Sequence, residues 1–120
     1  MRRRVPTNPE LANTIGYLKQ KGRQHQTPLW VAVASYLAKS RRSRIVLNIG
    51  QVSRHSIEGG TVVVPGKVLG SGEPVRKLTI AAFKFSPSAL AKVEKTGGRC
   101  IPISRLVEEN PHGTNVKLLR

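Results

Sequence analysis

One stretch of the chain has residue types that could hold a phosphate: residues 61–73, with the sequence TVVVPGKVLGSGE. Pro65 and Gly66 suit the two central positions of a type II turn, because proline presets a negative φ and glycine takes the positive one. The pattern predicts a hairpin with Lys67 just beyond its turn, followed by a loop whose glycines leave the backbone bare. A bare backbone beside a cation can approach a phosphate closely. A hairpin followed by an ordinary surface loop explains the same residues, so both interpretations stay open.

The known nucleotide motifs do not fit this stretch. A P-loop requires a hydroxyl residue after its Gly-Lys pair to hold magnesium, and Val68 occupies that position. A dinucleotide fingerprint requires a third glycine three residues after Gly72, and Val75 stands there. The stretch therefore predicts no nucleotide cofactor.

Residues for catalysis or metal binding are sparse elsewhere. Cys100 and the three histidines lie far apart in the chain, without the paired spacing of a zinc site. All six acidic residues are glutamates, and the adjacent Glu108 and Glu109 point about 100° apart on a helix, which does not suit a catalytic pair. No nucleophile-elbow motif is present. We therefore expect no catalytic residue, no metal, no cofactor and no small-molecule substrate.

The sequence also indicates a compartment. A single cysteine is typical of a reducing environment. No apolar run follows the basic start, as a secretory signal would require. The longest apolar run, residues 29–34, is far shorter than the ~20 residues of a membrane span. These features predict a soluble cytoplasmic protein.

Charge is the strongest global feature. The chain has 21 Lys and Arg residues against 6 acidic ones, a formal net charge of +15. Such an excess destabilises a compact chain by self-repulsion unless a polyanion neutralises it. Nucleic acid is the leading partner, and an anionic membrane is the lesser candidate. Charge of this kind gives affinity and salt dependence but carries no sequence information.

The candidate phosphate contacts occupy an N-terminal arm, helix ends, a junction between a helix and a strand, and later loops. They are Arg2, Arg3, Arg4, Lys19, Lys21, Arg23, Lys39, Arg41, Arg42, Arg44, Arg54, Lys67, Arg76 and Lys77. The cations of residues 19–23 have a simpler explanation, since they complement the dipole at a helix end. The junction, residues 39–44, carries more cations than a dipole requires and is the preferred phosphate contact.

Local patterns predict an α/β protein with a basic arm (residues 1–7) and one domain (residues 8–120). Helices are expected to begin at Asn8-Pro9, Thr27-Pro28 and Ser86-Pro87, since each pair places a capping residue before a proline. Gly22 is expected to end the first helix. The apolar runs 45–49, 61–64, 68–69, 78–85 and 99–103 predict strands, residues 50–60 an irregular segment, and residues 104–110 a short helix before a tail.

Some of these elements carry a specific expectation of packing. Strand, helix and strand over residues 78–103 predict a βαβ unit with parallel strands and a right-handed crossover. Pro102 should confine the last strand to an edge. Trp30 and Tyr36 are expected in the core. The pair Phe83 and Phe85 is also expected there, because the context of an RNA-recognition motif is absent.

The segment TVVVPGKVLGSG at 61–72 resembles the signature of the archaeal and eukaryotic large-subunit ribosomal protein eighteen-e family. Three further segments agree: TNPEL at 7–11, PLW at 28–30 with Val33-Ala34, and AAFKFS at 81–86 with Gly97-Gly98. Residues 67–73 and 84–89 are also similar to the C-terminal domain of bacterial-type ribosomal protein fifteen. Because no long eukaryotic extension follows, the chain resembles an archaeal member.

The resemblance implies an irregular (ββα) superhelical α/β core with a small mixed or parallel sheet, preceded by two N-terminal helices. It further implies a structural role in the cytoplasmic ribosome, on large-subunit rRNA and beside other large-subunit proteins, without catalysis, cofactor or homo-oligomer. The residues alone leave two alternatives: a free-standing nucleic-acid-binding regulator, and an RNA-modifying or RNA-cleaving enzyme.

Overall fold

The structure is a computed structural model that describes residues 9–39, 45–74 and 76–120. Several predictions fall outside the described residues. They are the basic arm with Arg2, Arg3 and Arg4, the Asn8 cap, and Arg41, Arg42 and Arg44 of the junction.

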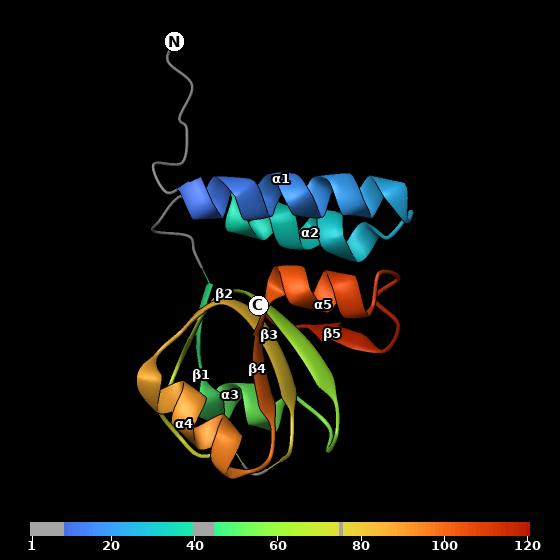
Figure 1. The fold of residues 1–120 in the computed structure, drawn as a ribbon. Coiled ribbons are helices and arrows are strands. Elements are labelled where there is room, and N and C mark those ends of the chain that lie inside the picture. Colours follow the sequence, from blue (N-terminus) through green and yellow to red (C-terminus); the bar gives the residue numbers. More distant parts are fainter. Residues whose placement is uncertain (1–8, 40–44, 75) are drawn as a thin grey trace.

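The described part of the chain alternates helices and short strands (Figure 1). In chain order the elements are α1 (Pro9–Gln24), α2 (Pro28–Leu37), β1 (Ile45–Asn48), α3 (Ile49–Arg54), β2 (Thr61–Leu69), β3 (Thr79–Phe85), α4 (Pro87–Lys95), β4 (Arg99–Pro102), α5 (Ile103–Glu109) and β5 (Val116–Leu118). The two N-terminal helices lie side by side, and α5 lies between them and the sheet (Figure 1). This architecture confirms the predicted α/β fold with two leading helices.

The two N-terminal helices pack through the apolar positions that their spacing predicts. Leu11, Ile15 and Leu18 of α1 are buried. The prediction that Gly22 ends this helix is wrong: α1 continues to Gln24, and Gly22 is buried against Val31 of α2. Its lack of a side chain serves the contact between the two helices rather than a C-cap.

Of the two aromatic residues of α2, one lies in the core and one does not. Trp30 is wholly buried, and its indole N–H donates a hydrogen bond to the carbonyl oxygen of Pro111 at 2.7 Å. The prediction for Tyr36 is wrong, because this residue is partly exposed and lies outside both apolar clusters. Helical spacing places Tyr36 on the flank of the buried stripe, where cations approach its ring.

The five strands of the described chain are paired in parallel throughout. They follow the order β1-β2-β3-β4, and β5 also pairs with β2. One edge of β2 pairs with β3, and the other edge is shared by β5 and β1. Along this second edge, β5 pairs with Thr61 to Val63 and β1 pairs with Gly66 to Leu69. As predicted, β4 is parallel to β3 and lies at the outer edge.

The predicted hairpin at Pro65-Gly66 is wrong, because both residues lie inside the single strand β2. Pro65 falls between the segments that pair with β5 and with β1, so its missing N–H costs no ladder hydrogen bond. Gly66 lies opposite Ile45, whose carbonyl oxygen occupies the place that a Cβ would take. The register between β2 and β3 shifts between Val64 and Lys67. The Pro-Gly pair therefore permits a close strand contact and a bulge, not a turn.

Two elements were missed by the sequence patterns. The segment expected to be irregular begins with α3, which opens with a capping box: the Asn48 backbone N–H donates to the Gln51 side chain at 2.9 Å. The tail contains β5, whose pairing with β2 is set by tertiary contacts. Each element is too short for a reliable periodic signal. By contrast, α4 begins as predicted, with the Ser86 hydroxyl accepting from the Ala89 backbone N–H at 3.2 Å.

The core is divided between the two faces of the sheet. One cluster joins α1, α2 and α5 to the sheet and includes Trp30 and Val63. The other joins α3 and α4 to the sheet and includes Val64 and Val93. Neighbouring residues of β2 thus enter different clusters, as alternating side chains of a strand buried on both faces must. Phe83 and Phe85 pack against these clusters while remaining partly exposed.

Candidate nucleic-acid interface

The glutamates of the described chain neutralise a particular set of cations. Three of them form ion pairs: Glu10 with Lys84 (3.2 Å), Glu73 with Lys92 (3.4 Å), and Glu109 with Arg99 (2.9 Å) and Arg105 (3.0 Å). None of these four paired cations belongs to the predicted phosphate contacts. Conversely, no predicted cation that the structure describes forms an ion pair with a described carboxylate, although the backbone N–H of Lys77 donates to the carboxylate of Glu58 at 2.9 Å. The predicted cations that the structure describes are Lys19, Lys21, Arg23, Lys39, Arg54, Lys67, Arg76 and Lys77.

Glu109 shows what pairing does to charge. Hydrogen bonds from Arg99 and then Arg105 lower the pKa of the Glu109 carboxyl, and the same contact raises the pKa of Arg99. All three groups are therefore ionised at neutral pH, and two positive charges share one negative charge. Exposed pairs of this kind add little stability. Their effect is to reduce the positive field on this part of the surface.

The three predicted cations of α1 do not act as one group. Lys19 and Arg23 are four residues apart and share an exposed face with Gly16. Lys21 lies on another flank, where its ammonium is 5.7 Å from the centroid of the Tyr17 ring and donates to the side chain of Gln24 at 3.4 Å. The first face is free of described ion pairs and lines an open hollow of about 640 Å³.

The end of α2 brings together two cations that are distant in sequence. The ammonium of Lys39 lies 4.8 Å from the centroid of the Tyr36 ring, and the guanidinium carbon of Arg120 lies 5.6 Å from the same centroid. Arg120 was missed because no local pattern connects the end of the chain to α2. Two positive charges thus lie close to the Tyr36 ring, and a phosphate could neutralise them.

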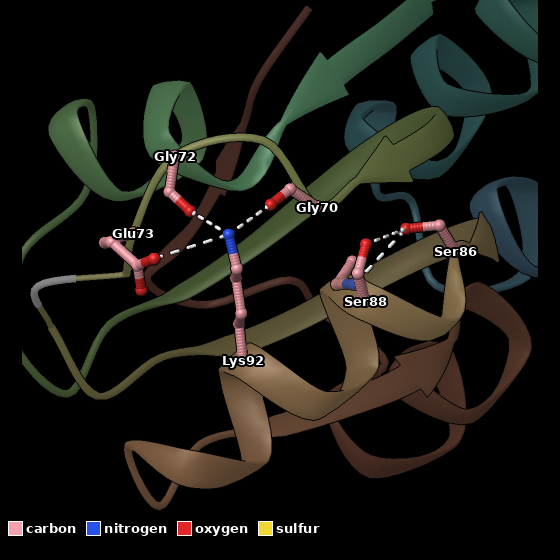
Figure 2. Close-up of polar contacts among 7 residues, drawn as sticks. Gly70, Gly72, Glu73, Ser86, Ser88 and Lys92 are labelled. Carbon is pink, nitrogen blue, oxygen red and sulfur yellow. Dashed lines mark hydrogen bonds and ion pairs between the residues drawn. The ribbon is translucent and has the colours of Figure 1, made fainter.

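The glycine loop after β2 is folded onto the protein (Figure 2). The ammonium of Lys92, from α4, donates to the carbonyl oxygens of Gly70 and Gly72, both at 2.6 Å, and lies 3.4 Å from the carboxylate of Glu73. On its other side, the carbonyl of Ser71 accepts from the backbone N–H of Gly50 at 3.0 Å. The loop is thus held by its carbonyl groups between α3 and α4. Its glycines serve internal packing, and Lys92, which orders them, was not anticipated.

Gly70 itself packs against α4. The hydroxyl of Ser88 occupies the place that a side chain at this position would take. Farther along, the guanidinium of Arg76 donates to the buried Ser53 carbonyl oxygen at 2.7 Å, which ties the segment after the loop to α3. Arg76 is therefore engaged in the fold, while the neighbouring Lys77 is exposed.

The remaining predicted cations are exposed at separate places. Arg54 ends α3, and Lys67 lies on β2 beside Lys84 in the register of β3. Two further lysines lie outside the predicted set: Lys95 is an exposed residue of α4, and the ammonium of Lys117 donates to the His55 carbonyl oxygen at 2.6 Å. The positive surface is consequently distributed over several elements.

The titratable groups of the described chain do not assemble a metal or catalytic centre. Within residues 9–39, 45–74 and 76–120 no three His, Cys, Asp or Glu side chains are grouped to hold a metal ion. His25 and His112, distant in sequence, meet edge to face with ring centroids 5.5 Å apart. Burial, with a smaller contribution from Glu94, raises the pKa of the Cys100 thiol to about 11, so it is not a ready nucleophile at neutral pH. Among the described helices, none is long and apolar enough to cross a membrane.

Fold and charge together define a small basic α/β protein whose exposed, unpaired cations suit a polyanion. The family of this chain is then evident from comparison with known proteins: it belongs to the family described as "Ribosomal protein 60S L18 and 50S L18e", whose model matches residues 11–120.

Curated relatives cover nearly the whole chain. A protein of Methanospirillum hungatei named "Large ribosomal subunit protein eL18" is 41% identical, over 99% of this chain and 98% of its own length. Proteins of the same name are similar at 38% identity in Methanococcus maripaludis and at 40% in Methanothermobacter thermautotrophicus, each over 99% of this chain and at least 98% of their own length. The resemblance identified from the residues is confirmed, including its archaeal character.

Family membership places the chain among the structural proteins of the large ribosomal subunit, in the cytoplasmic ribosome. The members of this family are structural ribosomal proteins, and the family is not one of enzymes.

Proposed function

We propose that this protein binds large-subunit rRNA and stabilises the folded RNA, beside neighbouring large-subunit proteins and without catalysis. The contacts are made by cations that form no ion pair with a described carboxylate. The observation that carries the proposal is the division of charge. Glutamates form ion pairs with Lys84, Lys92, Arg99 and Arg105, whereas the charged groups of the predicted contacts that the structure describes form no ion pair with a described carboxylate. Unpaired cations can release the counterions of a phosphate backbone, which is the main source of such affinity.

The proposal assigns parts of the chain to separate tasks. Residues 8–120 act as one domain that displays the described cations. The arm with Arg2, Arg3 and Arg4 and the junction with Arg41, Arg42 and Arg44 extend its contacts along RNA. The Gly70–Glu73 loop contributes to RNA binding by its shape, because its carbonyl groups accept hydrogen bonds from α3 and α4.

Co-sedimentation tests the proposal directly. The tagged protein should travel with the large subunit through a sucrose gradient at moderate salt, and should bind protein-free large-subunit rRNA with an affinity that falls steeply with salt. A protein that remains in the free pool, and that prefers one short duplex sequence over rRNA, would contradict the proposal.

A matched pair of double variants tests which cations contribute. Arg41→Gln with Arg42→Gln should lower the slope of log affinity against log salt by up to about two. Arg99→Gln with Arg105→Gln removes the same formal charge from cations that share Glu109, and should change the slope much less. Equal slopes for the two double variants would show that net charge, and not the identity of the unpaired cations, governs binding.

A further inference from the structure

The outer face of α1 combines two features that do not stabilise the isolated protein. Gly16 lies in the middle of the helix and is exposed, and a Cβ built at this position meets nothing within 4 Å. Packing therefore does not require a glycine here, although glycine destabilises a helix interior relative to alanine. On the same face Lys19 and Arg23 stand four residues apart, a like-charge spacing that also disfavours a helix.

Among the described residues, no carboxylate forms an ion pair with the cations of this face. Lys19 and Arg23 have no described carboxylate partner, and Glu10, the acid of α1, lies in the first turn beside Lys84. The neutral lining residues Gln20 and Gln24 add amide groups that can donate hydrogen bonds or accept them. The face is thus positive and rich in hydrogen-bond donors, and it carries no side chain at Gly16, its N-terminal end.

The shape of the face excludes an enclosed small ligand. The hollow is lined by five residues of one helix, Gly16, Lys19, Gln20, Arg23 and Gln24, and is open to solvent. Small-molecule sites bury most of the surface of their ligand. From Gly16 to Arg23 the helix rises about 10 Å, which corresponds to about three nucleotides of a helical strand. An elongated polyanion can lie along such a face.

From these observations we infer that the Gly16 face of α1 is a docking site for an RNA strand, with the backbone of the RNA seated over Gly16 and its phosphates neutralised by Lys19 and Arg23. This inference rests on the proposed function, which concerns the protein as a whole. It adds a specific site and a steric requirement. Any side chain at position 16 would stand where the RNA approaches the helix.

The steric requirement separates binding from stability. Gly16→Gln places a side chain in the hollow without changing charge, and because the position is open it should keep or raise the urea midpoint of the full-length protein. It should weaken binding to protein-free large-subunit rRNA by about tenfold at fixed salt. The matched control is Ala91→Gln, which places the same side chain on the exposed part of α4 and should leave both quantities nearly unchanged.

The charge requirement gives a second measurement. Lys19→Gln with Arg23→Gln should lower the slope of log affinity against log salt by up to about two. Wild-type affinity for rRNA in Gly16→Gln would overturn the docking site. The docking site for RNA would also be overturned if this variant bound protein-free rRNA normally but failed to enter large subunits. That result would show that the face contacts a protein. Failure of the wild-type chain to bind rRNA would instead overturn the proposed function, so the two failures are distinguishable.

Discussion

Lys92→Met should destabilise the fold although it changes an external lysine of α4. The wild-type ammonium donates to two backbone carbonyl oxygens at 2.6 Å, and 30% of the side chain is exposed. A hydrogen bond to a charged group contributes about 1.5–3 kcal/mol when well buried. Partial exposure favours the lower end, and methionine keeps the apolar stem. We therefore expect a loss of about 2–3 kcal/mol, from two bonds that are not fully additive.

Urea unfolding followed by fluorescence is a suitable assay, because the single tryptophan, Trp30, is wholly buried. Two controls isolate the carbonyl contacts. Glu73→Gln should change the free energy of unfolding by less than about 0.5 kcal/mol, since its side chain is 77% exposed. Lys95→Met, an exposed lysine of the same helix, should also change it little. The reasoning is refuted if Lys92→Met is as stable as the wild type, or if Glu73→Gln costs as much as Lys92→Met.

Two further outcomes concern a strand contact and a surface carboxylate. Gly66→Ala should cost about 3 kcal/mol or more in urea unfolding, because the new carbon would overlap the Ile45 carbonyl oxygen of β1; the control Gly16→Ala should not destabilise, and equal stability of the two variants would contradict the strand contact. Arginine contacts lower the pKa of Glu109, so its contribution to stability is present above the unfolded-state pKa, near 4.5, and is lost as pH falls through the lower folded-state pKa. Glu109→Gln should therefore reduce stability at neutral pH and match the wild type at about pH 2; an unchanged difference between these two pH values would contradict the assignment.

Local signals account for the parts of the fold that the sequence predicted. The spacing of Leu11, Ile15 and Leu18 determines which face of α1 is buried, because a helix repeats its faces every three to four residues. Ser86-Pro87 starts α4 through a hydroxyl that accepts a hydrogen bond within the first turn. Neither feature depends on a distant part of the chain.

The errors arise where distant segments decide the conformation. Pro65-Gly66 has the local preference of a turn, yet the pairing of β2 with three other strands holds it extended. Gly22 has the local preference of a helix end, but its contact with Val31 keeps it inside α1. In both cases the energy of tertiary packing exceeds a backbone preference of about 1 kcal/mol.

In the candidate interface, too, some features follow from the sequence and others depend on tertiary contacts. The excess of cations and the lack of catalytic motifs follow from the residues themselves, and the signature at 61–72 is a property of the sequence. The contact of Arg120 with Tyr36 and the hold of Lys92 on the glycine loop could not be predicted, since neither pair is close in the chain. The contacts assigned to Arg2, Arg3, Arg4, Arg41, Arg42 and Arg44 stay predictions.

The sequence by itself determined the net charge of +15, the starts of α1, α2 and α4, and the family. Only the tertiary structure decided which charges remain available to a partner. Six glutamates cannot neutralise 21 cations, so the choice of pairs matters, and Coulomb attraction acts over a few ångströms that only folding can set. The fold pairs Lys84, Lys92, Arg99 and Arg105 with glutamates, and it leaves Lys19 and Arg23, which lie beside the exposed Gly16, without an ion pair to any described carboxylate.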